Sequence, residues 1–341
     1  MKAAVLVAPQ RIEIQDLPDP SIEDREILVK LKACGICTLE QRLFTGAMKI
    51  SYPLVPGHEA SGEIVEVGKG VVGNFKPGMR VALDLVMRCG QCYYCRIGRS
   101  NFCENRFKPG QRMLGGFGEY IAVRPGQVYP ASPALSFAEA AFTEPLSCCI
   151  HSLKKLRLSM SEDVLIVGSG VMGLMHLLVA QNMGLRTTIT DPDPERLAMA
   201  RQLGVDYALD PRTTDVVSHA KEITEGLGFS ACIVTSPAPV ALESAVASLA
   251  KCARVNIYTA YEEKLTIPLD ANTIHRQEFL VTGTEGRLEG DFFQAIRLLS
   301  FGKVKVAPLV SAKTSFSRIA EGMQTALSKS AFRVLLEHEA P

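Results

Sequence analysis

The sequence contains no long block of charge of one sign. Its 37 Lys and Arg residues are balanced by 36 Asp and Glu residues, so the net charge is only +1. Without a basic patch or an acidic tail, the pattern predicts a protein that binds neither nucleic acid nor an anionic membrane surface.

Long hydrophobic runs are also missing, and no apolar segment reaches the length of a transmembrane helix. The N-terminal run in MKAAVLVAPQ is interrupted at Pro9, before it reaches the length of a signal-peptide core. We therefore expect a cytoplasmic protein. The chain has no internal repeat or low-complexity linker, and its 341 residues predict about two domains.

The clearest motif is a glycine-rich turn between an apolar run and a helical pattern. Residues 164–167 read as a buried strand, and Gly168, Gly170 and Gly173 follow with G-x-G-x-x-G spacing. Such glycines permit a tight turn, close approach of a pyrophosphate and close helix–strand packing. Asp191 ends the next apolar run, where a carboxylate binds the adenosine ribose and repels a 2′-phosphate. We predict an NAD site rather than an NADP site.

Other residues are assigned to the same site by position. Strand and helix alternate over about residues 152–283, which predicts a doubly wound parallel sheet with strands at 206–210, 231–235, 254–258 and 280–283 and a helix at 242–250. Arg196 either stacks on the adenine or is a solvated charge, and Thr235 lies at a carboxyl end where such sheets bind ligands. The assigned residues are Gly168, Gly170, Val171, Met172, Gly173, Asp191, Arg196 and Thr235.

Six of the ten cysteines lie within residues 34–103. Four of them, Cys89, Cys92, Cys95 and Cys103, have gaps of two, two and seven residues. Such thiolates can close a tetrahedral shell around a structural zinc, and the alternatives are an iron–sulfur site or four unrelated thiols. A closed coordination shell leaves no position for substrate, so we expect this zinc to stabilise the fold of a loop at about residues 88–104.

A second candidate metal site lies nearer the N-terminus, among short alternating runs that predict a separate, mainly β domain. It consists of Cys37, His58 and Glu59. Each residue alone is commonly structural, because free cysteines are often buried and single histidines often pack in cores. The combination upstream of a nicotinamide-binding pattern favours a catalytic zinc with an open position.

The order of these motifs resembles the zinc-dependent medium-chain alcohol and polyol dehydrogenases. Cys37, GHE at 57–59, the four cysteines and GGFGEY at 115–120 precede the glycine motif, and the resemblance covers essentially the whole chain. It implies an α/β protein: a GroES-like mainly-β catalytic domain at 1–151 and 284–341, a Rossmann domain at 152–283 and a cleft between them. Relatives are mostly dimers or tetramers, and we expect a homotetramer.

The resemblance also implies further site residues. Glu144, in AAFTEPLSCCIH, matches the carboxylate that reaches the catalytic zinc directly or through water in the sorbitol dehydrogenase branch. Thr284 is placed beside the nicotinamide carboxamide. The expected cofactors are NAD and two zinc ions per chain, one catalytic and one structural.

The sequence departs from the family where a proton relay is usual. Leu39 replaces a Ser or Thr, and Arg42 replaces a His, although Glu40 keeps an acid. Thr38 is one residue early for a relay. We expect zinc-bound water with Glu59 or Glu144 to take the proton. Arg42 either binds an NAD phosphate or an anionic or highly hydroxylated substrate, or it is a surface charge.

We therefore predict a zinc- and NAD-dependent enzyme that oxidises a polyol, sugar alcohol, cyclitol or related secondary alcohol. One alternative is a zinc-free quinone or enone reductase on the same fold, against which the complete set of candidate zinc ligands argues. The other is a non-catalytic NAD- or zinc-binding protein, supported only by Leu39 and Arg42.

Overall fold

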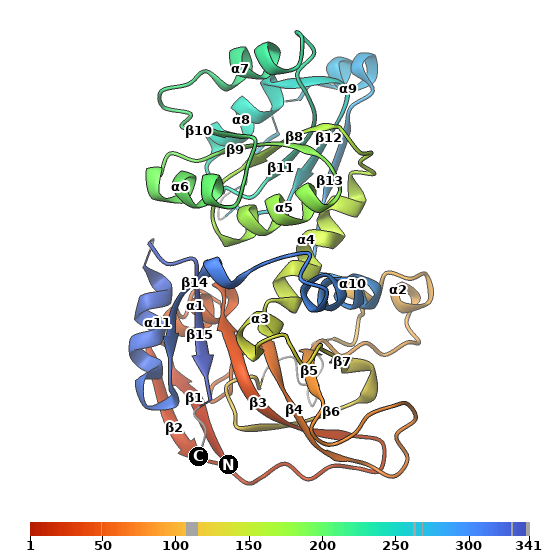
Figure 1. Ribbon diagram of the computed structural model, residues 1–341, viewed down its shortest axis with the longest axis vertical. Coiled ribbons are helices and arrows are strands. Elements are labelled where there is room, and N and C mark those ends of the chain that lie inside the picture. The colour runs from red at the N-terminus through yellow and green to blue at the C-terminus, as the bar shows by residue number, and fades with distance from the viewer. Residues whose placement is uncertain (49, 107–114, 262–263, 268, 329, 339–341) are drawn as a thin grey trace. The chain divides into compact units, whose positions relative to one another are not determined.

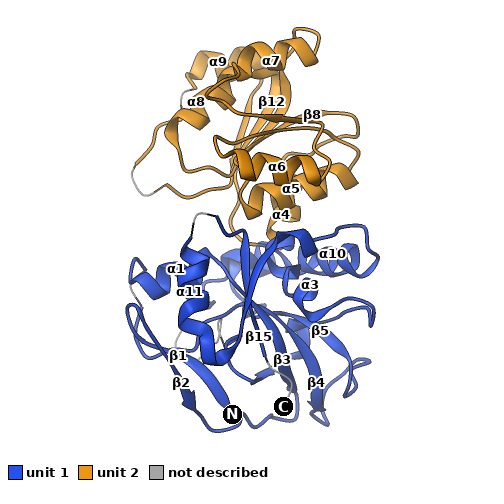
Figure 2. Ribbon diagram, turned by 60° about the vertical axis from the view of Figure 1, so that its left-hand side comes forward, with its two compact units in different colours: residues 1–147, 287–341 blue, residues 148–286 orange. Residues whose placement is uncertain are grey.

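A computed structural model describes residues 1–48, 50–106, 115–261, 264–267, 269–328 and 330–338 (Figure 1). The chain divides into two compact units (Figure 2). Unit 1 comprises Met1–Ser147 and Arg287–Pro341, and unit 2 comprises Cys148–Gly286. These divisions lie within four residues of those expected from the sequence, at 151/152 and 283/284.

Unit 1 is built on β-sheets. Strands β1 (Lys2–Ala8) and β2 (Arg11–Asp16) form an antiparallel pair. The larger sheet has the order β14-β15-β3-β4-β5-β7, and β6 also pairs with β3. Its strands are β3 (Ile27–Ile36), β4 (Glu59–Val67), β5 (Arg80–Asp84), β6 (Tyr120–Val123), β7 (Val128–Pro130), β14 (Val310–Thr314) and β15 (Arg333–Glu337).

The C-terminal segment completes this sheet, because β15 pairs antiparallel with β3 with Val334 opposite Ile36. Buried side chains such as Leu31, Leu83 and Phe117 form its core. The helices of unit 1 are α1 (Thr38–Thr45), α2 (Tyr93–Arg96), α3 (Phe137–Ala141), α10 (Glu289–Ser300) and α11 (Ile319–Leu327), and α4 (Thr143–Lys155) begins there. Short 3-10 turns lie at Ser100–Phe102, Pro125–Gln127, Ala307–Leu309 and Phe316–Arg318.

Unit 2 contains a parallel sheet with the order β10-β9-β8-β11-β12-β13. In chain order this is 3-2-1-4-5-6, the order of a Rossmann fold, so the predicted fold class is confirmed. The strands are β8 (Asp163–Val167), β9 (Arg186–Thr190), β10 (Tyr207–Leu209), β11 (Phe229–Val234), β12 (Leu249–Ile257) and β13 (Leu280–Gly283). The helices are α5 (Val171–Asn182), α6 (Pro194–Gln202), α7 (Val216–Ile223), α8 (Pro239–Ala247) and α9 (Ala271–Gln277).

Two predicted elements differ most from the structure. The strand expected at 254–258 is β12, which begins at Leu249 and ends at Ile257. The helix expected at 242–250 is α8, which begins at Pro239 and ends at Ala247. Proline suits the first turn of a helix, whereas Leu249 already pairs with Phe229 in the sheet. Strand pairing thus overrides the local helical pattern. Among the described residues, no helix is long and apolar enough to cross a membrane.

Candidate metal and dinucleotide sites

Cys37 and Glu40 lie at the start of α1, directly after β3. Cys37 is the N-cap, and its Sγ accepts a hydrogen bond from the N–H of Leu39 at 3.2 Å. Glu40 completes a capping box, since its Oε2 accepts from the Cys37 N–H at 3.1 Å. Helix capping therefore fixes both side chains before any metal binds.

His58 is oriented by the same glutamate. Its Nδ1–H donates to Glu40 Oε1 at 2.8 Å, and the N–H of Gly57 donates to that oxygen at 3.2 Å. Gly57 has φ +94°, a conformation that favours glycine. The hydrogen bond at Nδ1 leaves His58 Nε2 as the acceptor, and this atom lies 3.5 Å from Cys37 Sγ.

Glu59 begins β4 and is buried against the backbone of β3. A Cβ at Gly35 would lie 1.9 Å from Glu59 Oε2, so only glycine leaves room for this carboxylate. Glu59 Oε1 lies 3.1 Å from Arg333 Nη2, and Arg333 also donates to the carbonyl of Ile36 at 3.1 Å. Arg333 is available because β15 pairs beside β3.

Cys37, His58 and Glu59 form a set of ligand atoms within 4.8 Å of one another. Burial, followed by the charge of Glu40, raises the pKa of the Cys37 thiol to about 12, although His58 opposes this. Burial also raises the pKa of Glu59 to about 7, against the opposing charge of Arg333. A bound cation would relieve both penalties. Thiolate, imidazole and carboxylate are zinc ligands, and three of them leave one position open.

Glu144 lies beside this set, in the first turn of α4. Its Oε1 is 4.0 Å from His58 Nε2, and the same carboxylate pairs with Arg287. The other arm of Arg287 lies 2.7 Å from Asp84 Oδ1. Burial opposes ionisation of Asp84, but Arg287 and Arg88 outweigh it and lower its pKa below the usual value. Coordination of a metal by Glu144 therefore remains a prediction.

Thr38 and Arg42 both lie on α1 and are exposed, whereas Leu39 is half-buried. Their roles in proton transfer or substrate binding remain predictions. Three carboxylates lie close to His58: Glu40 Oε1 at 2.8 Å from Nδ1, Glu144 Oε1 at 4.0 Å from Nε2, and Glu59 within 4.8 Å, and Glu40 is the one that orients His58.

The four-cysteine loop brings its thiols together as its spacing predicts. The Sγ atoms of Cys89, Cys92, Cys95 and Cys103 lie within 4.8 Å of one another. Sulfur atoms around a tetrahedral zinc are about 3.8 Å apart for Zn–S bonds of about 2.3 Å. The N–H groups of Gln91 and Cys92 point at Cys89 Sγ, at 3.4 and 3.3 Å, and lower its pKa to about 6. The donor set therefore fits a structural zinc.

In unit 2 the glycine motif lies at the carboxyl end of β8. Gly168 has φ +100°, and Gly170 is the N-cap of α5, which begins with Val171 and Met172. A Cβ at Gly173 would lie 1.9 Å from the carbonyl oxygen of Gly168. Strand and helix can therefore pack closely only with glycine here, and the N–H groups of the helix start remain available to phosphate.

The other candidate dinucleotide residues surround this loop. The carboxylate of Asp191 accepts the N–H groups of Ser169 at 2.7 Å and Asp193 at 2.9 Å, which fixes it beside the loop. Thr235 follows β11, next to β8 at the point where the strand order reverses, and its hydroxyl donates to the Val167 carbonyl at 2.8 Å. Ligands bind at such switch points.

Two further predicted residues have defined surroundings. A Cβ at Gly170 would lie 3.2 Å from Arg196 Nη1, so Arg196 lies over the glycine loop. Thr284 exchanges hydrogen bonds with Asn256, whose amide also donates to Ser152 Oγ at 2.6 Å. Their contacts with a cofactor remain predictions.

Several residues around the metal site were not found from the sequence. They are Arg287, Arg333, Asp84 and Gly35, and Glu40 was noted only as an acid. Arg333 begins β15 (RVLLE) and Asp84 ends β5 (RVALD), each at the edge of a three-residue apolar run, and this position was the available signal.

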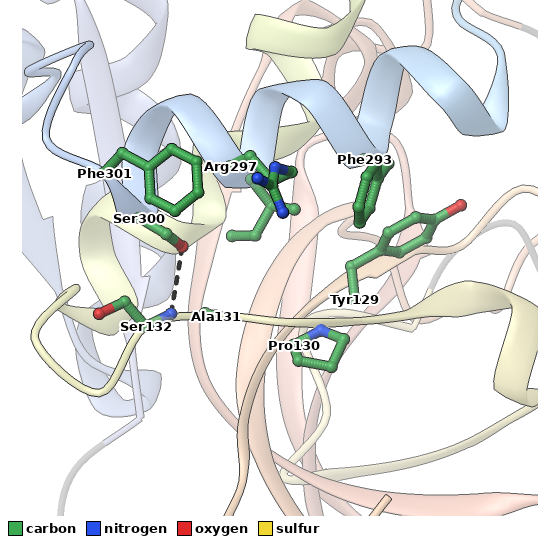
Figure 3. A pocket seen from close by; sticks show the side chains of 9 residues that line it. Tyr129, Pro130, Ala131, Ser132, Phe293, Arg297, Ser300 and Phe301 are labelled. Carbon is green, nitrogen blue, oxygen red and sulfur yellow. Dashed lines mark hydrogen bonds between the residues drawn. The ribbon is translucent and has the colours of Figure 1, made fainter. Parts of the chain in front are cut away.

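A separate pocket of about 410 Å³ lies where α10 packs on β7 and the following loop (Figure 3). The guanidinium of Arg297 stacks on Phe301 there, with 4.6 Å to the ring centroid. The Ser132 N–H donates to Ser300 Oγ at 3.1 Å. None of the predicted site residues lines it.

Comparison with known proteins gives consistent matches. The model of the alcohol dehydrogenase GroES-like domain matches residues 23–133, and that of the zinc-binding dehydrogenases matches residues 171–300. Sorbitol dehydrogenase of Bacillus subtilis (strain 168) is 33% identical, over 96% of this chain and 94% of that protein.

Solved structures are similar over the same length. A structure described as a zinc-binding dehydrogenase from Sinorhizobium meliloti 1021 bound to NADP has a TM-score of 0.90 at 26% identity and covers 98% of each chain. Galactitol-1-phosphate dehydrogenase from Escherichia coli has a TM-score of 0.89 at 26% identity, covering 99% of this chain and 100% of that one.

Proposed function

The chain belongs to the zinc-dependent medium-chain alcohol and polyol dehydrogenases, and from this premise we propose that it oxidises a polyol or related secondary alcohol. The observation that carries the proposal is the convergence of Cys37 and His58, which are half-buried, with the buried Glu59, and with Glu144 beside them. Zinc and a nicotinamide dinucleotide are the cofactors of this oxidoreductase family. The zinc-free reductase is not favoured, because the ligand set is complete.

The residues of unit 1 would hold the catalytic zinc, and the glycine loop of unit 2 would hold the dinucleotide. When bound, the zinc would supply a Lewis acid for an alcohol oxygen, and the dinucleotide would supply an acceptor for the hydride of the adjacent carbon. Glu40 keeps His58 in the tautomer whose Nε2 is a ligand. Arg333 lies 3.1 Å from Glu59 and favours its charged form, but burial outweighs this and raises the pKa of Glu59 to about 7, so a bound cation would be needed to stabilise the anion.

We propose that the carboxylate of Glu144 takes the proton from the substrate hydroxyl. Its Oε1 lies 4.0 Å from His58 Nε2, beside the set of candidate zinc ligands, and the same carboxylate pairs with Arg287. Glu144→Gln is expected to lower kcat by about 10²-fold or more while the protein remains folded. Near-wild-type turnover would exclude this role.

NAD is proposed as the preferred cofactor. The Asp191 carboxylate is fixed beside the glycine loop, where it would repel the 2′-phosphate of NADP. A comparison of kcat/KM for the two cofactors tests this, and Asp191→Asn is expected to narrow the difference. Equal use of both cofactors by the wild type would contradict the assignment. We also propose a cytoplasmic homo-oligomer, for which sedimentation and fractionation are the tests.

The decisive experiment is zinc content by elemental analysis, on protein purified without chelators. About two zinc ions per chain are expected, falling to about one in Cys37→Ser. A screen of polyols, cyclitols and phosphorylated polyols with NAD would then identify the substrate. A value of about one zinc that Cys37→Ser leaves unchanged would contradict the catalytic-zinc proposal.

A further inference from the structure

A chain of alternating charges leads away from Glu144 through the interior of unit 1. Glu144 pairs with Arg287, and Arg287 Nη2 lies 2.7 Å from Asp84 Oδ1. The second oxygen of Asp84 is engaged by another cation, since Arg88 Nη1 lies 2.8 Å from Asp84 Oδ2. Each carboxylate oxygen of Asp84 thus binds a different guanidinium.

Arg88 extends the chain in two ways. Its Nη2 donates to the backbone carbonyl of Arg287 at 3.2 Å, so it fixes the backbone as well as the charge of the next member. Its Nε lies 3.4 Å from Glu289 Oε1, and the other oxygen of Glu289 accepts the hydroxyl of Ser100 at 2.6 Å. The sequence of contacts is Glu144–Arg287–Asp84–Arg88–Glu289–Ser100.

Two members of this series, Arg88 and Ser100, belong to the four-cysteine loop. Arg88 directly precedes Cys89, the first thiol of the loop, and Ser100 lies between Cys95 and Cys103. Folding of the loop around its four thiols therefore fixes Arg88 from its own backbone and Ser100 against Glu289. The loop is tied to the carboxylate of the catalytic site through side chains.

The middle members of this series of ion pairs are buried. The exposed fraction of the side chain is 0% for Asp84, 5% for Arg287 and 8% for Arg88, whereas it is 48% for Glu289. A buried charge that loses its partner is strongly penalised, so each member follows the position of its neighbour. A displacement at Arg88 is therefore carried to Arg287 and to Glu144.

We propose that the four-cysteine loop positions Glu144 at the catalytic metal site through Arg88 and Arg287, an inference that rests on the proposed function. Arg88 and Arg287 are positioning residues, and neither contacts the reacting atoms. The loop metal then has a role beyond local stability, because its loss frees Arg88 and loosens the metal held by Cys37 and His58.

The test weakens the contacts of Glu289, the most exposed charged member of the series, whose side chain is 48% exposed. Glu289→Gln removes a charge from Arg88, and Ser100→Ala removes the hydroxyl that holds Glu289. Glu321→Gln is the matched control, because Glu321 forms an exposed ion pair with Arg318 on another helix of unit 1. Thermal unfolding verifies that the variants fold.

Each protein is prepared with zinc in the four-cysteine loop and Co²⁺ at the Cys37 site. The readouts are the visible absorption of the cobalt site, the rate of cobalt release to a chelator, and kcat and KM separately. Glu289→Gln and Ser100→Ala are expected to alter the cobalt spectrum, to accelerate release by about threefold to tenfold and to lower kcat with little change in KM.

The inference would be overturned if both variants had the same cobalt spectrum and release rate as Glu321→Gln. Glu289 and Ser100 would then have no influence on the position of Glu144. The proposed function has a separate test in the wild type. A wild-type protein that binds no metal at Cys37 would overturn the function, and the inference with it, whatever the variants show.

Discussion

Glu40→Gln tests the role of a residue that contacts no proposed reactant. The carboxylate of Glu40 is buried and accepts the His58 Nδ1–H, the Gly57 N–H and the Cys37 N–H, at 2.8, 3.2 and 3.1 Å. Burial opposes its ionisation, but His58 and the hydrogen bonds from His58 and Cys37 lower its pKa below the usual value. Its charge and both oxygens are therefore in use.

Glutamine cannot satisfy these donors in either orientation. If its oxygen faces His58, its NH₂ group meets the Cys37 N–H, and an unsatisfied buried donor costs about 1–3 kcal/mol. If its NH₂ group faces His58, Nδ1 must accept and Nε2 carries the proton, which is the wrong tautomer for a ligand. We expect zinc affinity at the Cys37 site to fall by about 10–100-fold, or about 1.4–2.7 kcal/mol.

The assay is competition for zinc with a chromophoric chelator, together with the free energy of unfolding in urea. The chain offers a matched control in Glu139→Gln, because Glu139 completes the capping box of α3 without a histidine partner. Both variants lose a capping carboxylate, but only Glu40→Gln should lose zinc. If Glu40→Gln binds zinc as tightly as Glu139→Gln does, Glu40 does not orient His58 for the metal.

Three further predictions follow from other parts of the structure. Gly173→Ala places a Cβ 1.9 Å from the backbone oxygen of Gly168, so we expect it to abolish dinucleotide binding measured by calorimetry. Gly126→Ala is the control, because a Cβ there meets no atom within 4 Å. Equal dinucleotide binding by the two variants would contradict the packing argument. Burial lowers the pKa of His176 to about 4, so the unfolded chain binds its proton first, and stability should fall by about 3 kcal/mol between pH 6.5 and pH 4. His176→Gln should flatten this dependence in urea unfolding, and an unchanged slope would exclude the histidine as its source. Asp84→Asn should cost about 3–5 kcal/mol of unfolding free energy by leaving two buried guanidinium groups short of an anion, whereas Asp19→Asn, at an exposed ion pair, should cost little.

Local spacing was sufficient for the parts of this protein that are built from one short segment. The four thiols converge because two-residue gaps and a short loop bring them together, and the glycine motif marks the turn from β8 to α5. The predicted Rossmann sheet is confirmed, as is membership of the dehydrogenase family. The end of α8 was wrong, because a strand pairing made by Leu249 was invisible to local periodicity.

The sequence alone predicted the candidate zinc ligands, the glycine turn and the fold class, because short motifs and the alternation of strands and helices can be read without knowing which distant segments meet. Only the tertiary structure decided which arginine side chains pair with the buried carboxylates of the metal site. Arg333 reaches Glu59 because β15 pairs with β3, almost three hundred residues away, and Arg287 joins Glu144 to Asp84 because the chain returns to unit 1 after unit 2. Long-range ion pairs leave no periodic signal in sequence, since burial and strand register, not spacing, select the partners.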